Sequence, residues 1–346
     1  MPLRALLCPY CGAPLPAEAK RRVVTCRYCE AAVTWDQVVV RAADFARALE
    51  RLDERDATER VWLAGLPYRV RGRCGRGESS DVYLAERARR VSELVLLKVL
   101  RAPEDADLLV REWETLRALQ QAGARGTPHF SQFLPQPVAR GTVQWSGEAR
   151  EVLALRYASG YAHTLDDVVS AHPGGVDARH GVWLWRRMLE MLAWLHDAGW
   201  AHGAILPQHV IVNARDHGVR LVGWSCAVEL GADRAVAFSA LHEAFYPKAI
   251  LAGAAPTRMM DLVMGARCVS HALGAAPGAK LPAAVPQGIA ELLNVYATDG
   301  SRAPTANAWE LHDIVGRAAR EAFGPPTFQP FVMPGDPGVA RQPGGP

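Results

Sequence analysis

The chain has 346 residues, which at about 150 residues per domain predicts roughly two domains. Its 39 basic and 36 acidic residues leave a formal charge of +3, which excludes a nucleic-acid binder driven by overall charge. Apolar residues make up 49% and charged residues 22%, so the chain can bury a sizeable core and is not disordered throughout.

The sequence favours a cytoplasmic location with no membrane association. No stretch reaches the 18 or more consecutive apolar residues that a membrane-spanning helix needs, and the first residues lack the apolar core of a signal peptide. Four cysteines cluster near the N-terminus and three are single, which is not a secreted disulfide framework. The scarcity of lysine beside arginine, with abundant Ala and Gly, is typical of a GC-rich bacterial genome.

Two C-x-x-C pairs separated by 14 residues predict a structural zinc site in residues 1–40. The ligands would be Cys8, Cys11, Cys26 and Cys29. Four thiolates leave no open position for a substrate, so such a site folds the segment without catalysing a reaction. The pattern resembles a zinc ribbon, with short strands over 22–25 and 31–35. Two redox dithiols or an expendable tail remain the alternatives.

The flanking segments are simpler. A small basic face around Arg21, Arg22 and Arg27 allows a zinc ribbon that reads nucleic acid, but nearby acidic residues dilute it, so nucleic-acid binding is not expected. Residues 41–62 are predicted to form a connecting helix or linker. Residues 324–346 are rich in Pro and Gly and predict a disordered tail.

Between these segments the chain predicts an α+β domain over residues 63–323. Strand-like runs at 68–73, 82–87 and 93–100 precede a helical pattern at 106–121, further strands continue to residue 157, and mainly helical segments follow. A β-rich lobe over about 63–157 and an α-rich lobe over about 158–323 are therefore expected.

Motifs along this domain resemble those of the protein kinase family. In the first lobe, Gly75, Gly77 and Val82 match the glycine-rich loop, with Ser80 in place of the third glycine. Lys98 matches the strand lysine that contacts the ATP phosphates, and Glu112 matches its ion-pair partner. The resemblance implies a two-lobed kinase-like fold and a vestigial nucleotide-binding site made of these five matching residues.

The second lobe continues the resemblance. Residues 200–212 overlay the catalytic loop, and residues 220–225 lie where D-F-G belongs. Asp261 and Gly265 resemble the start of a buried helix, and residues 301–305 resemble the late D-R-P-S segment. Packing residues also match, with His202, Trp224 and Leu116 in one interlobe stack and Val82, Leu96 and Ile211 in a second.

The positions that carry kinase chemistry are replaced. The catalytic aspartate is Ala204, the catalytic-loop lysine is Leu206, and the two Mg²⁺-binding positions are His209 and Gly223. A methyl group cannot accept a proton, and Mg²⁺ prefers oxygen ligands to imidazole. The sequence therefore predicts a pseudokinase rather than an enzyme, a scaffold or regulatory module for a protein partner. Zinc is the expected metal, and neither ATP nor Mg²⁺ is expected.

Two alternatives stay open beside this prediction. Residual nucleotide binding would use Lys98 and Glu112, although Leu96 is larger than the alanine that faces adenine in kinases, so a structural ion pair is favoured. An atypical kinase would have to recruit another acid, such as Asp216 or Asp233.

The segment after the D-F-G position lacks the features of an activation switch. Its only obvious phosphorylation site is Ser239. Lys248 stands where kinases carry a glutamate that pairs with the arginine matched by Arg302, so repulsion between these two residues is expected.

Overall fold

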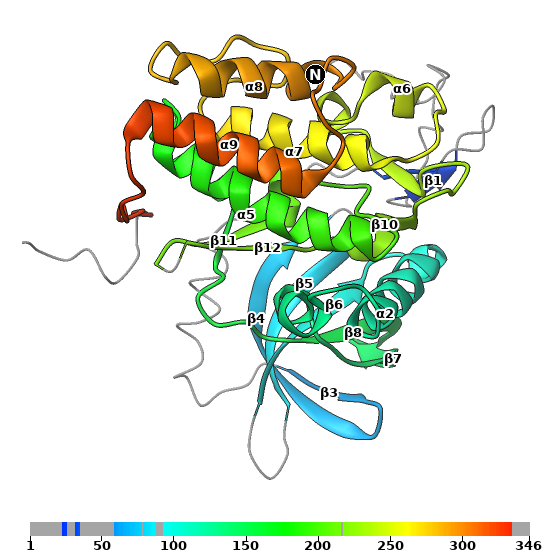
Figure 1. The fold of residues 1–346 in the computed structure, drawn as a ribbon. Coiled ribbons are helices and arrows are strands. Elements are labelled where there is room, and N and C mark those ends of the chain that lie inside the picture. Colours follow the sequence, from blue (N-terminus) through cyan, green and yellow to red (C-terminus); the bar gives the residue numbers. More distant parts are fainter. Residues whose placement is uncertain are drawn as a thin grey trace, which may run out of the picture.

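The structure, a computed structural model, describes residues 59–77, 79–87, 93–215 and 217–333, with the backbone of residues 23–25 and 32–34. A β-sheet lobe is followed by a mainly helical lobe, as Figure 1 shows. The α+β order predicted from the sequence is therefore confirmed. The four zinc-ligand cysteines, most of the connecting segment and residues 334–346 lie outside the described residues.

The first lobe is built on a six-stranded antiparallel sheet with the order β3-β4-β5-β6-β8-β7. Its strands are β3 (Glu59–Leu63), β4 (Leu66–Arg76), β5 (Ser80–Arg87), β6 (Glu93–Leu100), β7 (Pro137–Trp145) and β8 (Glu148–Arg156). Buried aliphatic side chains alternate along β6, with Val95, Leu97 and Val99 in one cluster of the core. This period of two is the reason why the segment forms a strand with one face in the core.

The sheet begins earlier than the sequence predicts. The sequence predicts a connecting helix or linker over residues 41–62, but Glu59–Leu63 forms β3 and pairs with β4. Val61 and Leu63 are buried on either side of the exposed Trp62, an alternation that fits a strand and not a helix. The linker boundary at residue 62 is therefore wrong, because the sheet already starts at Glu59.

Helix α2 (Ala106–Gln120) lies beside the sheet and follows the short turn η1 (Pro103–Asp105) (Figure 1). Its buried face includes Leu109, Glu112, Leu116 and Leu119. These residues recur at helical spacing, so the helix turns one stripe toward the core. Two short elements, α3 (Thr127–Phe130) and η2 (Ser131–Phe133), lead from α2 to β7.

The second lobe is predominantly helical (Figure 1). Its helices are α4 (Leu165–Ala171), α5 (Ala178–Asp197), α6 (Lys248–Leu251), α7 (Arg258–Ala272), α8 (Gln287–Thr298) and α9 (Ala308–Phe323). A capping box between Thr164 and Asp167 starts α4, and Asn307 caps α9 with its side-chain oxygen. Helices α5 and α7 are central, because most residues of each are buried, including Trp185 and Trp194 of α5.

Short strands and turns connect the helices and carry the candidate site. The strands are β9 (His163–Thr164), β10 (Trp200–Ala201), β11 (Val210–Asn213), β12 (Gly218–Leu221), β13 (Val228–Glu229) and β14 (Ala237–Ser239). The turns are η3 (Pro207–His209), η4 (Trp224–Cys226) and η5 (Glu243–Phe245). Five of these strands form the small sheets β12-β11-β9 and β10-β13. The catalytic-loop and D-F-G positions therefore lie at the ends of paired strands.

A third small sheet joins the N-terminal segment to the second lobe. Strands β1 (Val23–Thr25) and β2 (Ala32–Thr34) pair antiparallel, at the positions where the sequence predicts the strands of a ribbon. Strand β2 then pairs in parallel with β14, with Val33 opposite Phe238. The N-terminal hairpin therefore adds two strands beside β14, which lies between the D-F-G position and α6.

The chain after α9 packs on the helical lobe as far as the structure describes it. The sequence predicts disorder from residue 324, yet Phe331 and Met333 are buried. The Phe331 ring lies 4.9 Å from that of His180 and 5.5 Å from that of Trp183. The prediction is wrong for residues 324–333, because two apolar side chains in this Pro- and Gly-rich segment pack against the helical lobe. Among the described residues, no helix is long and apolar enough to cross a membrane.

Candidate functional site

The candidate site lies where β4, β5, β6 and α2 face the short elements of the second lobe. Lys98 on β6 and Glu112 on α2 form an ion pair and hydrogen bond there. Glu112 is 1% exposed, so its carboxylate depends on the ammonium of Lys98 for compensation. The structure thus brings together the two residues that the resemblance pairs.

The glycine-rich turn between β4 and β5 is closed on itself. The amide of Gly77 donates a hydrogen bond of 2.8 Å to the carbonyl of Ser80. Arg101 donates through its guanidinium to the Gly77 carbonyl (2.6 Å), and its backbone amide donates to the carbonyl of Ser79. The Gly77 amide, which a phosphate cradle would need free, is therefore already used inside the turn.

An apolar cluster occupies the region where the resemblance places adenine. Leu84 and Cys74 are fully buried in it, and Val82, Leu96, Tyr157 and Ala162 pack against them. Leu96 also packs against the main core, so it links the two clusters. Leu96, which is larger than the alanine of kinases, therefore packs against protein side chains without a ligand.

Two residues that match the kinase catalytic loop are buried in the core. Ala204 and Leu206 are each 1% exposed and belong to the main core. Leu206 is therefore a packing residue, where the matched lysine of a kinase would be at the transferred phosphate. Neither residue can contribute a proton or a charge at this place.

His209 fills the space beside the D-F-G position. Its Nδ1 lies 2.8 Å from the carbonyl oxygen of Ala204. A carbonyl only accepts hydrogen bonds, so Nδ1 carries the proton. A Cβ atom at Gly223 would lie 2.7 Å from Cε1, Nδ1 and Nε2 of the same ring. Gly223 has φ +81°, in the left-handed region that glycine adopts freely. No side chain fits at residue 223 unless His209 moves.

The stack that the resemblance places between the lobes is present. The rings of His202 and Trp224 meet edge-to-face at 4.6 Å, and Leu116 of α2 is fully buried in the same core. Burial lowers the pKa of His202 to about 4, so its ring is neutral at pH 7. Trp224 donates its indole N–H to the carbonyl of Leu221 at 2.8 Å. The contact between these two rings therefore involves no charged side chain.

Two arginines outside the matched kinase motifs fix the segment after the D-F-G position. Arg111 of α2 donates to the carbonyls of Ser225 (3.4 Å) and Ala227 (3.3 Å). Arg267 of α7 donates to those of Ala244 (3.1 Å) and Tyr246 (2.6 Å) and also bonds the end of α8. In the sequence, only their positions on helices close to the matched residues Glu112 and Gly265 could have pointed to them.

The sequence singles out Lys248 and Ser239 in this segment, and the structure leaves the first exposed and the second buried. Lys248 and Arg302 are both exposed, and Arg267 is the residue that binds the end of the segment. Ser239, the predicted phosphorylation site, is 1% exposed and its hydroxyl lies 2.9 Å from Nδ1 of His242. A kinase could not reach this hydroxyl unless β14 opened.

The two lobes, the Lys98–Glu112 pair and the matched loops define a protein kinase-like fold. No protein-family model and no curated protein matches the sequence. Among solved structures, the chain is similar to one described as the BubR1 kinase domain, with a TM-score of 0.55 and 14% identity. The match covers 81% of this chain and 91% of that chain. At this identity the similarity establishes the fold alone.

Proposed function

We propose that this protein is a cytoplasmic pseudokinase that serves as a scaffold or regulatory module for a protein partner. The observation that carries the proposal is the ring of His209, which occupies the volume that a metal-binding side chain at residue 223 would need. Phosphoryl transfer depends on a positioned base and on metal ions that bridge the phosphates. Ala204 and Gly223 have no side-chain oxygen for either task.

We further propose that residues 1–40 form a zinc ribbon that docks on the kinase-like domain. The motif with Cys8, Cys11, Cys26 and Cys29 supports a structural metal. The β1–β2 hairpin also supports it, because the residues that connect its strands include Cys26 and Cys29. Pairing of β2 with β14 would let the ribbon cover the segment that presents peptide substrates in kinases.

The purified protein should contain one zinc ion per chain. A double substitution of Cys26→Ser and Cys29→Ser should remove it, since two ligands cannot hold the ion tightly. Metal analysis after gel filtration measures the zinc content. The matched control is Cys268→Ser, which changes a buried cysteine of α7 outside the motif. Zinc retained in the double variant would contradict the assignment of these ligands.

The inactive site can be tested by attempting to rebuild it. The wild type should transfer no γ-phosphate from ATP with Mg²⁺ or Mn²⁺ and should show no metal-dependent thermal shift with ATP. Gly223→Asp alone should not change this, because the His209 ring blocks the new side chain. Gly223→Asp with His209→Asn should gain an Mg²⁺-dependent shift, because two oxygen ligands replace the ring. Phosphate transfer by the wild type that Lys98→Ala abolishes would overturn the proposal.

A second candidate function is nucleotide binding without catalysis. The Lys98–Glu112 pair favours it, because in kinases the lysine of this pair contacts the phosphates and the glutamate orients the lysine. The occupied Gly77 amide and the packing of Leu96 oppose it. A thermal shift of the wild type with ATP alone, independent of metal, would favour this candidate.

A further inference from the structure

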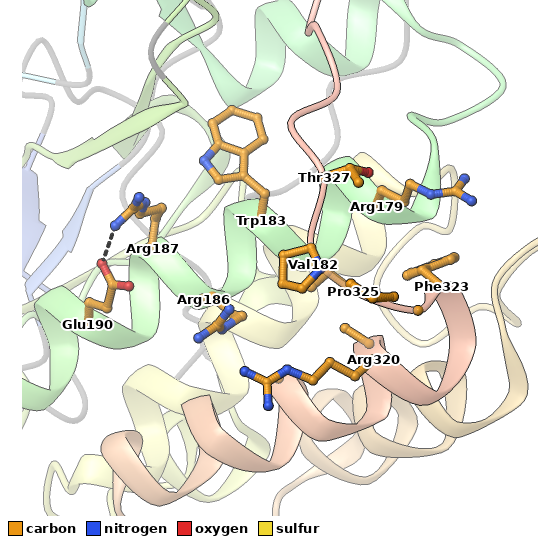
Figure 2. A pocket seen from close by; sticks show the side chains of 14 residues that line it. Arg179, Val182, Trp183, Arg186, Arg187, Glu190, Arg320, Phe323, Pro325 and Thr327 are labelled. Atoms are coloured by element: carbon orange, nitrogen blue, oxygen red, sulfur yellow. Dashed lines mark hydrogen bonds and ion pairs between the residues drawn. The ribbon is translucent and has the colours of Figure 1, made fainter.

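A pocket lies in the helical lobe between α5, α9 and the chain that follows α9 (Figure 2). Its volume is about 230 Å³. Among the residues that line it, four are arginines and one is a carboxylate. These are Arg179, Arg186, Arg187 and Arg320, with Glu190 as the acid. The lining therefore carries an excess of positive charge in a chain whose charges are otherwise nearly balanced.

Glu190 does not neutralise the whole group. It forms an ion pair of 2.8 Å with Arg187, drawn in Figure 2, and lies 3.3 Å from Nε2 of His312. Burial alone would raise the pKa of Glu190, but hydrogen bonds from His312 and Arg187 hold it below the usual value. Arg179 has a carboxylate 3.5 Å away on Asp177. Glu190 is thus paired with Arg187, and Asp177 is paired with Arg179.

Arg186 and Arg320 are the arginines left over. Neither side chain has an ion pair or hydrogen bond in the part of the chain that the structure describes, and Nε of Arg186 is buried without a partner. The Arg186 guanidinium packs over Gly316 of α9, where a Cβ atom would lie 3.5 Å from its central carbon. Because neither guanidinium has an acidic partner among the described residues, both are available to pair with an anionic ligand.

Apolar side chains adjoin the arginines and form an apolar wall of the pocket. They include Val182, Trp183, Phe323 and Pro325, and Figure 2 shows Val182 and Pro325 among the arginines. The Arg179 guanidinium lies 4.6 Å from the centre of the Phe323 ring, which fixes both side chains. A ligand with an anionic group and an apolar body would therefore find a surface for each part.

We propose that this arginine pocket binds a phosphate monoester, with its phosphate between Arg186 and Arg320 and its organic group on the apolar wall. Two unmatched guanidinium groups balance the charge of nearly −2 that a phosphate monoester carries at pH 7. Planar guanidinium forks also match phosphate oxygens in pairs. The ester is either a free small molecule or a phosphorylated side chain of a partner protein. The site does not depend on the interlobe chemistry proposed above.

Titration calorimetry of the full-length protein with phenyl phosphate tests the site. We expect saturable binding that Arg186→Gln or Arg320→Gln each weakens by about 10- to 100-fold, the loss of one charge-assisted hydrogen bond. The matched control is Arg317→Gln, an exposed arginine of α9 that does not line the pocket and should leave binding unchanged. Benzoate, with the same ring and a single charge, should bind more weakly than phenyl phosphate.

A short phosphotyrosine peptide separates the two sources of the ester. Binding of the peptide at least as tight as that of phenyl phosphate supports a phosphorylated partner, and exclusion of the peptide with phenyl phosphate still bound supports a small molecule. The proposal is overturned if phenyl phosphate does not bind saturably to the wild type. It is equally overturned if Arg317→Gln weakens binding as much as the two pocket variants, or if benzoate binds as tightly.

Discussion

Replacing Asp261 with alanine should lower the free energy of unfolding by about 3–5 kcal/mol. The carboxylate is fully buried and accepts hydrogen bonds from the amides of His202 (2.8 Å) and Gly203 (3.0 Å). It also accepts from Nε2 of His196 at 3.0 Å. Alanine would leave three buried donors without an acceptor, at about 1–3 kcal/mol each before relaxation. Urea denaturation followed by circular dichroism measures the change.

The control for this prediction is Asp313→Ala on α9. The Asp313 side chain is 71% exposed, so its removal should change the free energy of unfolding by no more than about 0.5 kcal/mol. Equal stability of the Asp261→Ala and Asp313→Ala proteins would contradict the structural role of Asp261. Asp261 thus anchors the loop that also contains Ala204 and His209.

The kinase-like fold could be predicted from the sequence because its signals are local. Lys98 and Glu112 lie at the spacing that the family uses, and residues 94–100 form a short run that is apolar except for Lys98. The predicted strand coincides with β6, and the helix predicted over 106–121 differs from α2 by one residue. Asp261 could be recognised because its motif lies within one helix.

Long-range packing could not be predicted in the same way. The ring of His209 lies against Gly223, fourteen positions further along the chain, and only the folded loop brings them together. Arg267 binds backbone carbonyls, which every residue has, so no sequence pattern identifies its partners. The parallel pairing of β2 with β14 joins strands about 200 residues apart, and strand alternation does not specify a distant partner.

The Lys98–Glu112 pair allows a test of whether this site is kept for packing or for a ligand. Lys98→Met should lower the free energy of unfolding by about 3–5 kcal/mol, because it leaves the Glu112 carboxylate buried without compensation. The double variant Lys98→Met/Glu112→Leu should be clearly more stable than Lys98→Met alone, since no charge remains to be buried. Urea denaturation of the wild type, both single variants and the double variant gives the coupling free energy.

The result of this cycle bears directly on the proposed function. A large coupling with no effect of ATP on any of the four proteins means that the pair joins α2 to the sheet and has a structural role. The control is the more exposed pair of Arg187 and Glu190 on α5, whose side chains are 51% and 26% exposed and for which about 0.3–0.5 kcal/mol is expected. A stable Lys98→Met protein would contradict the structural role, and the wild type would then have to show ATP binding that this variant lacks. In that case the pair would be retained for a nucleotide, as it is in active kinases.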